Sequence, residues 1–446
     1  MDFEMIYDLI IVGGGPTGST AARYAKSNGI KRVLVVEENA SIGSPVQCAG
    51  LLSVAALRET DMTPDSFFVY NSVKGAKVYP PSGKQLKIVG KETKAYVVSR
   101  KMFDRKIAEK AANAGAEYLM KAQAVGLKDV VVAGDSGNMS NDMKLKCKAL
   151  EILHGGERKT LYAKVIIAAD GVRSSISKFA GLSPCEKVLS GIQIEANYKT
   201  EDKEFVEMFV GTEAPGFFAW SIPVSETVSR IGLAIDPKSV SQISEGNRSS
   251  RNENHLTENN LTENNLTENQ SAKDFLDHLL SNPVISEKIQ AGCSDFVVGG
   301  IPIGPMKKTY ASGLMVVGDA AGQCKPVSGG GIYTGAVAAK IAAKVAAEAI
   351  AENDFSEKKM SEYEKRWKKE LGRELDIGMR AHDYRMKLTD EEMNKIFNEL
   401  NDPEILDLIT EYGDMDHPSV LIQKLMLSKH SLKMAKLFGT FIKTLL

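Results

Sequence analysis

Near its start the chain reads Tyr7-Asp8-Leu9-Ile10-Ile11-Val12-Gly13-Gly14-Gly15-Pro16-Thr17-Gly18, and this stretch decides the fold. Its apolar half predicts a buried strand, and its glycine half predicts a tight turn that opens a helix. A second apolar strand, Val33–Val36, follows and ends at Glu37. A strand, a GxGxxG turn, a helix and an acid at the end of the next strand form the dinucleotide-binding fingerprint in its confirming context.

The presence of each residue of the fingerprint is explained by a separate physical requirement. Gly13 makes the tight turn, Gly15 lets the backbone approach a pyrophosphate, and Gly18 lets the helix and strand pack closely. The pyrophosphate is expected at the helix N-terminus, where free N–H groups and the helix dipole favour an anion. Glu37 is placed to accept hydrogen bonds from a ribose.

Two later segments indicate which dinucleotide is bound. Residues 165–174 read as a buried strand that ends in Asp170-Gly171, and residues 313–322 read as another that ends in Gly-Asp-Ala-Ala-Gly. A glycine run at 329–331 then precedes Ile332–Glu352, an alanine-rich segment that predicts a helix.

Together these segments resemble the FAD-binding domain of the para-hydroxybenzoate hydroxylase-like flavoproteins. The resemblance implies FAD as the cofactor, and the family counterpart of Asp319 holds the ribitol. An NAD-binding domain has no reason to carry the late Gly-Asp motif. By the same resemblance Arg100 is expected near the FAD phosphates and Ala124 near the adenine. Arg173 and Lys325 are left outside the site as surface charges.

The resemblance also implies where the flavin ring lies. Gly331 and Ile332 match the backbone site at the ring, and free N–H groups at a helix start favour negative charge on the reduced ring. Asp170 is assigned to the cofactor site because it ends a strand of the same domain.

Composition excludes several other classes of protein. The 446 residues carry a net charge of −1, which gives no nucleic-acid footprint. The five cysteines are scattered without metal-ligand spacing, which argues against a zinc site or a disulfide framework and for a reducing cytoplasm. No apolar run approaches the length of a membrane span, and no signal peptide is visible before the first strand. We therefore expect a cytoplasmic protein without a metal.

The domains are expected to interleave. The fold class is α/β, with a Rossmann-like FAD-binding domain interleaved with an antiparallel-sheet substrate domain and followed by a helical C-terminal region. The two strand-rich inserts are expected to form one sheet that covers the flavin. The predicted ranges are 1–75, 93–185 and 296–352 for the FAD-binding domain, 76–92 and 186–295 for the substrate domain, and 353–446 for the helical region.

A loop after the second strand carries a single cysteine. In this fold such a loop passes the flavin, so Cys48, Ala49 and Leu51 are expected cofactor contacts. A dithiol reductase would need two cysteines here, and only Cys48 is present. Cys48 is the candidate catalytic acid. The alternative is a buried free cysteine that acts as a small hydrophobic residue.

The stretch Pro215-Gly216-Phe217-Phe218-Ala219-Trp220-Ser221-Ile222-Pro223 resembles the geranylgeranyl reductase family, whose motif is Pro-x-x-Tyr-x-Trp-x-Phe-Pro. Phe218 and Ile222 replace the family Tyr and Phe; both changes keep the site apolar, and the first removes a hydroxyl. The resemblance implies that Phe218 and Trp220 line a pocket for a prenyl chain. The alternative is an ordinary aromatic core strand.

These resemblances imply an FAD-dependent reductase that saturates isolated double bonds in the geranylgeranyl chains of archaeal ether lipids. Two alternatives stay open: an FAD-dependent aromatic or isoprenoid monooxygenase on the same fold, and a non-catalytic escort that binds prenyl chains. No second nucleotide fingerprint is visible, so the electron donor could be ferredoxin, a nicotinamide or a deazaflavin. None of these motifs contains histidine, which leaves Cys48 or an ordered water as proton source.

The C-terminal residues carry lysines at helical spacing. Lys429, Lys433, Lys436 and Lys443 fall on one stripe of a helix, with apolar residues opposite. A basic amphipathic helix suits an anionic membrane surface, which predicts a peripheral position at the inner face. The alternative is a terminal helix packed on its own domain with its lysines in solvent.

Overall fold

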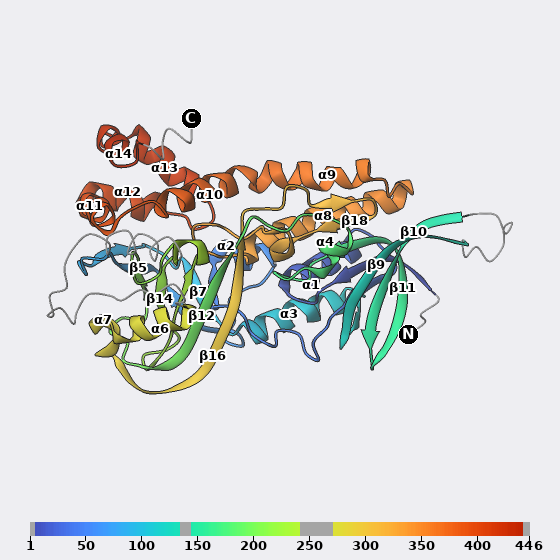
Figure 1. Ribbon diagram of the computed structural model, residues 1–446, viewed down its shortest axis with the longest axis horizontal. Coiled ribbons are helices and arrows are strands. Elements are labelled where there is room, and N and C mark those ends of the chain that lie inside the picture. Colours follow the sequence, from blue (N-terminus) through green and yellow to red (C-terminus); the bar gives the residue numbers. More distant parts are fainter. Residues whose placement is uncertain (1–4, 134–143, 241–270, 440–446) are drawn as a thin grey trace, which may run out of the picture.

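A computed structural model describes residues 5–133, 144–240 and 271–439 of the chain (Figure 1). A five-residue repeat at 256–270 and the last predicted lysine, Lys443, lie outside these described residues. Two large sheets lie side by side, and the C-terminal helices run along one side of both (Figure 1).

The first sheet carries the glycine fingerprint. Its central strands are parallel and all but the first residue of β1 are buried, as expected for a sheet covered on both faces. In spatial order the path is β17 (Tyr310–Ala311), β18 (Leu314–Val316), β11 (Glu157–Ala168), β1 (Ile6–Val12), β2 (Val33–Val36) and β8 (Glu117–Leu119). β9 (Ala122–Ala133) and β10 (Lys144–His154) extend the first half of β11 as antiparallel strands.

Helices cover one face of this sheet and form a common core with it. α1 (Pro16–Ser27), α3 (Arg100–Asn113) and α8 (Ile332–Glu352) bury mainly alanines against apolar strand residues. The small side chains let α1 and α8 approach closely, and a Cβ added at Gly335 would lie 2.5 Å from Oγ1 of Thr17. The N-termini of two helices are thereby brought to one edge of the sheet.

The second sheet joins the two inserts, as predicted. Its seven strands, in spatial order, are β16 (Ile289–Ile303), β12 (Lys187–Tyr198), β15 (Val228–Ile235), β14 (Ala219–Pro223), β13 (Phe205–Phe209), β5 (Gly75–Tyr79) and β6 (Leu86–Val89). The expectation of a fully antiparallel sheet was wrong at one place, because β13 and β5 pair in parallel. These two strands come from different inserts, so no hairpin imposes antiparallel pairing on them.

Short elements connect the two sheets. β3 (Leu51–Ser53), β7 (Ala95–Val98) and β4 (Val69–Val73) form a small sheet, and β3 leads into α2 (Val54–Glu59). Three further helices lie on the sheets: α4 (Ser175–Phe179), α6 (Ala272–Ser281) and α7 (Pro283–Ser286). Because β3 directly follows the loop of Cys48, that loop is fixed at the junction of the sheets.

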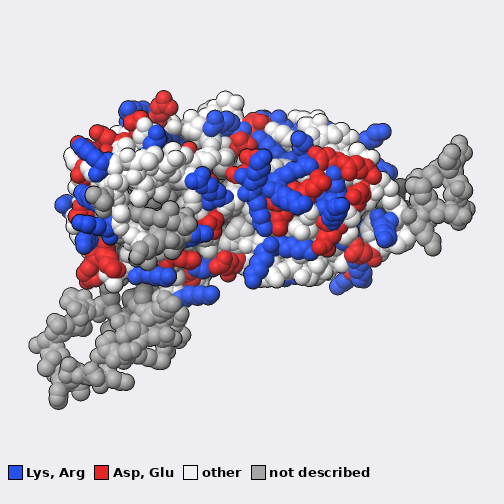
Figure 2. Space-filling model, turned by 90° about the horizontal axis from the view of Figure 1, so that it is seen from above, with Lys and Arg blue, Asp and Glu red and all other residues white. Residues whose placement is uncertain are grey.

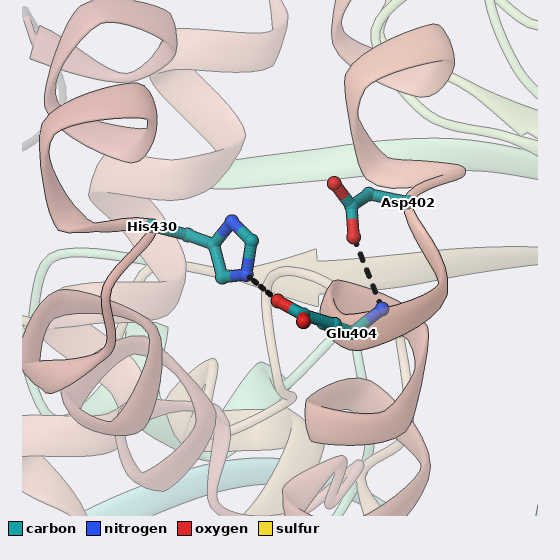
Figure 3. A group of neighbouring side chains, drawn as sticks. All are labelled: Asp402, Glu404 and His430. Carbon is teal, nitrogen blue, oxygen red and sulfur yellow. Dashed lines mark hydrogen bonds and ion pairs between the residues drawn. The ribbon is translucent and has the colours of Figure 1, made fainter.

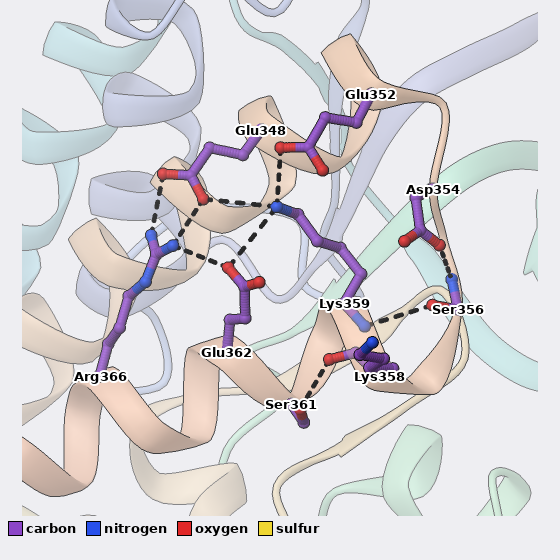
Figure 4. A network of polar contacts seen from close by, with 9 residues as sticks. All are labelled: Glu348, Glu352, Asp354, Ser356, Lys358, Lys359, Ser361, Glu362 and Arg366. Atoms are coloured by element: carbon purple, nitrogen blue, oxygen red, sulfur yellow. Dashed lines mark hydrogen bonds and ion pairs between the residues drawn. The ribbon is translucent and has the colours of Figure 1, made fainter.

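α9 (Glu357–Trp367) packs along α8 through a charged network (Figure 4). Lys359 lies 2.9 Å from Glu352 and 3.5 Å from Glu362, and Arg366 makes two hydrogen bonds of 2.7 and 2.9 Å to Glu348. These contacts join the C-terminal region to the FAD-binding part of the chain.

Beyond α9 (Glu357–Trp367) a π-helical turn leads to helices that lie over the second sheet (Figure 1). They are α10 (Arg373–Arg385), α11 (Asp390–Leu400), α12 (Pro403–Tyr412), α13 (Pro418–Leu427) and α14 (Ser431–Leu437). Among the described residues, no helix has both the length and the apolar character needed to cross a membrane.

Candidate functional site

The glycine turn has the geometry that its sequence predicts. Gly13 has φ +101°, and a Cβ atom there would lie 2.2 Å from the carbonyl oxygen of Ala169. A Cβ at Gly18 would lie 1.9 Å from the carbonyl oxygen of Gly13. Around Gly15, the N-cap of α1, a Cβ would meet nothing within 4 Å. The turn therefore leaves open space at the helix N-terminus, where an anionic group can approach.

Glu37 holds this turn from the end of β2. One carboxylate oxygen accepts a 2.7 Å hydrogen bond from the backbone N–H of Gly14, and the other accepts two of 2.8 Å from Asn39. Each carboxylate oxygen can accept more than one hydrogen bond, so acceptor capacity for a ribose remains. The carbonyl oxygen of Glu37 accepts from the N–H of Ala122, which places Ala124 of β9 close to the same strand end.

Asp319 and Gly331 meet at the start of α8. Asp319 is exposed although Gly318 and Ala320 on either side are buried, so its carboxylate faces open space. A Cβ at Gly331, the N-cap of α8, would lie 2.6 Å from Oδ1 of Asp319. Ile332 is the first residue of that helix. The residues expected to hold the ribitol and the flavin ring are thus adjacent.

A buried thiol lies at the same place. Sγ of Cys324 donates a 3.1 Å hydrogen bond to Oδ1 of Asp319. Burial and the neighbouring carboxylate raise the pKa of Cys324 well above its usual value, so this thiol is neutral at physiological pH. Sequence reasoning missed Cys324, although it lies only five positions after Asp319.

Asp170 caps a short helix. Its carboxylate accepts hydrogen bonds from Oγ of Ser174 at 2.8 Å and from the N–H of Ile176 at 3.1 Å, at the beginning of α4. Burial raises the pKa of Asp170. Its assignment to the cofactor remains a prediction, since both carboxylate oxygens already serve α4.

The Cys48 loop is fixed from several sides. Arg230 of β15 donates a 2.9 Å hydrogen bond to the carbonyl oxygen of Ala49, and a Cβ at Gly299 of β16 would lie 3.5 Å from Cβ of Gln47. The thiol itself is half-buried and accepts a 3.3 Å hydrogen bond from the N–H of Gly50. The loop therefore packs between β15 and β16 at the second sheet.

The guanidinium of Arg100 neighbours both the Cys48 thiol and Asp104, to which it makes hydrogen bonds of 2.9 and 3.0 Å. Burial alone would lower the pKa of Arg100, but Asp104 and Cys48 outweigh it and raise that pKa. The surroundings of Cys48 are thus polar on the side of Arg100.

The aromatic motif at 215–223 lies close to the Cys48 loop. Phe217 and Phe218 stack with centroids 4.3 Å apart, and Trp220 lies edge-on to Phe218 at 5.9 Å. The indole N–H of Trp220 donates a 2.9 Å hydrogen bond to the buried side chain of Gln193. One apolar cluster joins these rings to residues of the Cys48 loop, the Gly-Asp segment and the C-terminal helices, including Ala49, Leu51, Ile303, Cys324 and Met379.

Two basic residues of the site were missed by sequence reasoning. Lys325 is largely buried and paired with Asp416, so its assignment as a surface charge was wrong. Arg385 of α10 donates a 3.1 Å hydrogen bond to the carbonyl oxygen of Gly216 and lies 4.9 Å from the ring centre of Phe217. Burial lowers the pKa of Arg385 to about 10. The C-terminal region therefore contacts the aromatic motif through Arg385.

The predicted C-terminal helix is described only in part, because Lys443 lies outside the described residues. α14 ends at Leu437, and two of its predicted lysines make ion pairs within the chain: Lys429 with Glu404 at 2.6 Å and Lys433 with Glu399 at 2.8 Å. The preceding helix, α13, differs in its exposure. None of its ten residues is buried, although most are apolar. Figure 2 shows largely uncharged atoms at this end of the face and mixed charges along the other end.

Asp402, Glu404 and His430 also cluster at this end (Figure 3). Asp402 caps α12 through the N–H of Glu404, and Glu404 contacts His430 at 2.8 Å. These contacts, with the lysine pairs above, tie α12 to the start of α14. They explain the cluster as a structural junction, so it supports no metal site.

Comparisons with known proteins agree with this geometry. Residues 7–367 match the family model described as FAD binding domain. The digeranylgeranylglycerophospholipid reductase of Methanocaldococcus jannaschii is 34% identical over 89% of this chain and 91% of its own length. A second protein of that organism, named only as uncharacterized, is 34% identical over 95% of each chain. The crystal structure of a geranylgeranyl bacteriochlorophyll reductase-like protein from Thermoplasma acidophilum matches with a TM-score of 0.76 and 28% identity, covering 98% of this chain and 99% of that one.

Proposed function

The chain belongs to the FAD-binding family of the digeranylgeranylglycerophospholipid reductases, and we propose that it saturates isolated C=C bonds in the geranylgeranyl chains of archaeal ether lipids. The homologous reductases and the geranylgeranyl reductase-like neighbour support this reaction over oxygenation and over a non-catalytic escort role.

FAD is the cofactor, and this chain's residues fit it. The open space at Gly15 leaves room for a pyrophosphate, and the exposed Asp319 carboxylate beside Gly331 would hold the ribitol and the ring. When bound and reduced, FAD supplies a hydride. The protein must then bind the chain, exclude water and provide a proton.

One observation carries the substrate side of the proposal: the aromatic motif shares a single apolar cluster with the Cys48 loop and the Gly-Asp segment. An isolated alkene is not polarised, so it offers the protein no charge to bind. An apolar pocket that excludes water both holds such a chain and protects the reduced cofactor. Phe218 and Trp220 are proposed as its lining.

Cys48 is proposed as the proton donor. A thiol that gives up its proton leaves a negative sulfur, and here that sulfur already accepts from the N–H of Gly50 and neighbours the guanidinium of Arg100. Both groups hold the sulfur in place, as the positioning of a general acid requires. Cys324 is a second thiol of the site, and its hydrogen bond points to the carboxylate of Asp319.

Anaerobic reoxidation tests the function. Enzyme reduced with dithionite should regain its oxidised flavin spectrum when unsaturated archaeal lipid is added without oxygen. A monooxygenase would remain reduced until oxygen is admitted, and an escort would bind lipid without any spectral change.

We also propose that the protein works at an anionic membrane surface. Val420 and Leu427 on α13 are 40% and 77% exposed, and the basic residues Lys424 and Lys436 lie near them in the sequence. An amphipathic surface of this kind binds lipid through its apolar side chains and gains affinity from anionic head groups. We therefore assign the proposed contact mainly to α13, which precedes the terminal lysines.

A further inference from the structure

A buried ion pair connects the C-terminal helices to the loop that precedes α8. Lys325 lies in that loop and Asp416 in the turn between α12 and α13, and their side chains are 13% and 2% exposed. The two residues are separated by 91 positions in the chain. In a buried setting with little solvent screening, such charges interact strongly with each other and with any charge nearby.

The loop itself is closed by backbone hydrogen bonds. The N–H of Lys325 donates to Gly330 at 3.2 Å, and the N–H of Gly329 donates to Lys325 at 2.8 Å. A Cβ at Gly330 would lie 3.4 Å from Nζ of Lys325. The ammonium group is thereby held beside Gly330, one residue before Gly331, which is expected at the flavin ring.

A second contact fixes the turn that carries Asp416. Nε2 of His417 lies 3.2 Å from the hydroxyl of Tyr333, in the first turn of α8. The N–H of Asp416 donates a 2.6 Å hydrogen bond to Asp414. The carboxylate is thus positioned by its own turn as well as by the lysine.

We propose that this pair sets the reduction potential of the bound flavin. Lys325 stabilises the negative charge that the ring gains on reduction, and Asp416 opposes that stabilisation by neutralising the lysine. Asp416 is a positioning residue that acts through Lys325. The C-terminal region would in this way tune the cofactor from outside the FAD-binding part. The inference rests on the proposed function only in requiring bound FAD.

The test is the midpoint potential of the FAD-loaded enzyme, measured anaerobically by dye equilibration without lipid. Lys325→Met should lower the potential, since the reduced ring loses a cation. Asp416→Asn should raise it, since the cation is no longer neutralised. A tenfold change in the preference for reduced flavin is about 30 mV for two electrons. Shifts of this order and of opposite sign are expected.

Control variants distinguish an effect on the flavin potential from a purely structural attachment of the C-terminal region. Lys325→Arg keeps the charge and should restore the parental potential. Lys340→Met removes a similar ion pair of α8, with Glu59 at 2.8 Å, and should leave the potential unchanged. A pair that only attaches the C-terminal region would lower thermal stability in both variants without opposite shifts, and that result overturns the inference.

The outcome is independent of the lipid reaction. If Lys325→Met fails to retain FAD, the test rests on Asp416→Asn, because this variant leaves the lysine in place. An unchanged or lowered flavin potential in Asp416→Asn overturns the inference. A parent protein that binds FAD but does not reduce lipid contradicts the proposed reaction and leaves this measurement valid. A parent that binds no FAD contradicts the cofactor assignment itself.

Discussion

At the scale of single residues, the three fingerprint glycines meet two different requirements. Gly13 and Gly18 are required by the protein itself, because a side chain at either would collide with backbone. Gly15 is required only by what binds there, since the space around it is open. This difference allows folding and cofactor binding to be tested separately.

Gly15→Val should fold normally and yield largely FAD-free protein. The valine has room in the protein and the extended backbone at Gly15 suits it, but its side chain occupies the expected pyrophosphate position. The flavin content of purified protein and its thermal unfolding measure the two effects. Gly18→Ala is the contrasting variant and should lose stability. A fully flavinated Gly15→Val protein would falsify the pyrophosphate assignment.

Cys48→Ala should keep FAD and accept electrons but transfer them to lipid more slowly. A positioned general acid contributes about 10²–10⁴-fold to a rate. Stopped-flow reoxidation of prereduced enzyme by unsaturated lipid isolates this step. Cys324→Ala is the matched control, since it removes another nearby thiol. Its reoxidation by lipid should be faster than that of Cys48→Ala. A near-parental rate for Cys48→Ala leaves the cysteine as pocket lining.

Several site residues could be predicted because their motifs are local. Asp319 and Gly331 stand in one short segment after a strand, and the structure places them together as expected. Lys325 lies in the same segment, but its partner comes from the far end of the chain. No local pattern distinguishes a buried lysine from a surface one when its counter-ion is distant. Arg385 was missed because its contacts, the carbonyl oxygen of Gly216 and the ring of Phe217, are also distant in the chain.

At the scale of elements, strands and helices with clear periodicity were predicted well. The helix Ile332–Glu352 and the strand Val33–Val36 have the same bounds in the structure as in the prediction. The parallel pairing of β13 with β5 was not predicted, because pairing between distant strands is set by tertiary packing. Within the described residues the C-terminal helix α14 spans Ser431–Leu437, and the predicted pattern continues to residues that are not described.

Asp8 illustrates how one side chain stabilises the central strand. It lies 2.8 Å from Nζ of Lys164 on β11 and accepts a hydrogen bond from the N–H of Arg32. Burial would raise the pKa of Asp8, but these partners outweigh it and lower that pKa. A lowered pKa means that the stabilisation is present above the ordinary carboxyl pKa and is lost as the pH falls through the folded value.

Asp8→Asn should therefore lower the free energy of unfolding at pH 7 by about 1–3 kcal/mol, as for a lost hydrogen bond to a charged group. The difference from the parent should shrink below about pH 4, where the carboxylate becomes protonated. Denaturant titrations at pH 7 and below about pH 4 measure this difference in the free energy of unfolding. The exposed pair Lys273–Asp277 supplies a control, since Asp277→Asn should change little. A difference that is independent of pH would contradict this account.

Leu427→Glu should weaken binding to anionic vesicles, because it places a charge on the exposed apolar side of α13. Replacing Lys424 and Lys436 by Gln should cost about 1 kcal/mol for each lysine, and only on anionic lipid. Vesicle co-sedimentation measures both effects. Val131→Glu, at a 56% exposed position on β9, is the matched control and should bind like the parent. Equal binding of all variants removes the membrane role of α13.

At the scale of the whole molecule, the fold brings four distant segments to one place. The Cys48 loop, the aromatic motif, the Gly-Asp segment and the C-terminal helices come from different parts of the chain and share one apolar cluster. The interleaved order makes this possible, since the second sheet takes strands from both inserts. Sequence motifs identified three of these segments, whereas the contribution of α10 needed the structure because it carries no motif.

The most direct test of this account is the lipid product itself. A host that makes unsaturated archaeal phospholipid should, when it expresses this protein, accumulate lipid heavier by two hydrogen atoms for each reduced double bond, as measured by mass spectrometry. The same host with Gly15→Val should keep its lipid unsaturated, because that variant lacks FAD. Lipid that gains oxygen instead of hydrogen, or that remains unsaturated while the parent protein is fully flavinated and receives electrons, would contradict the account.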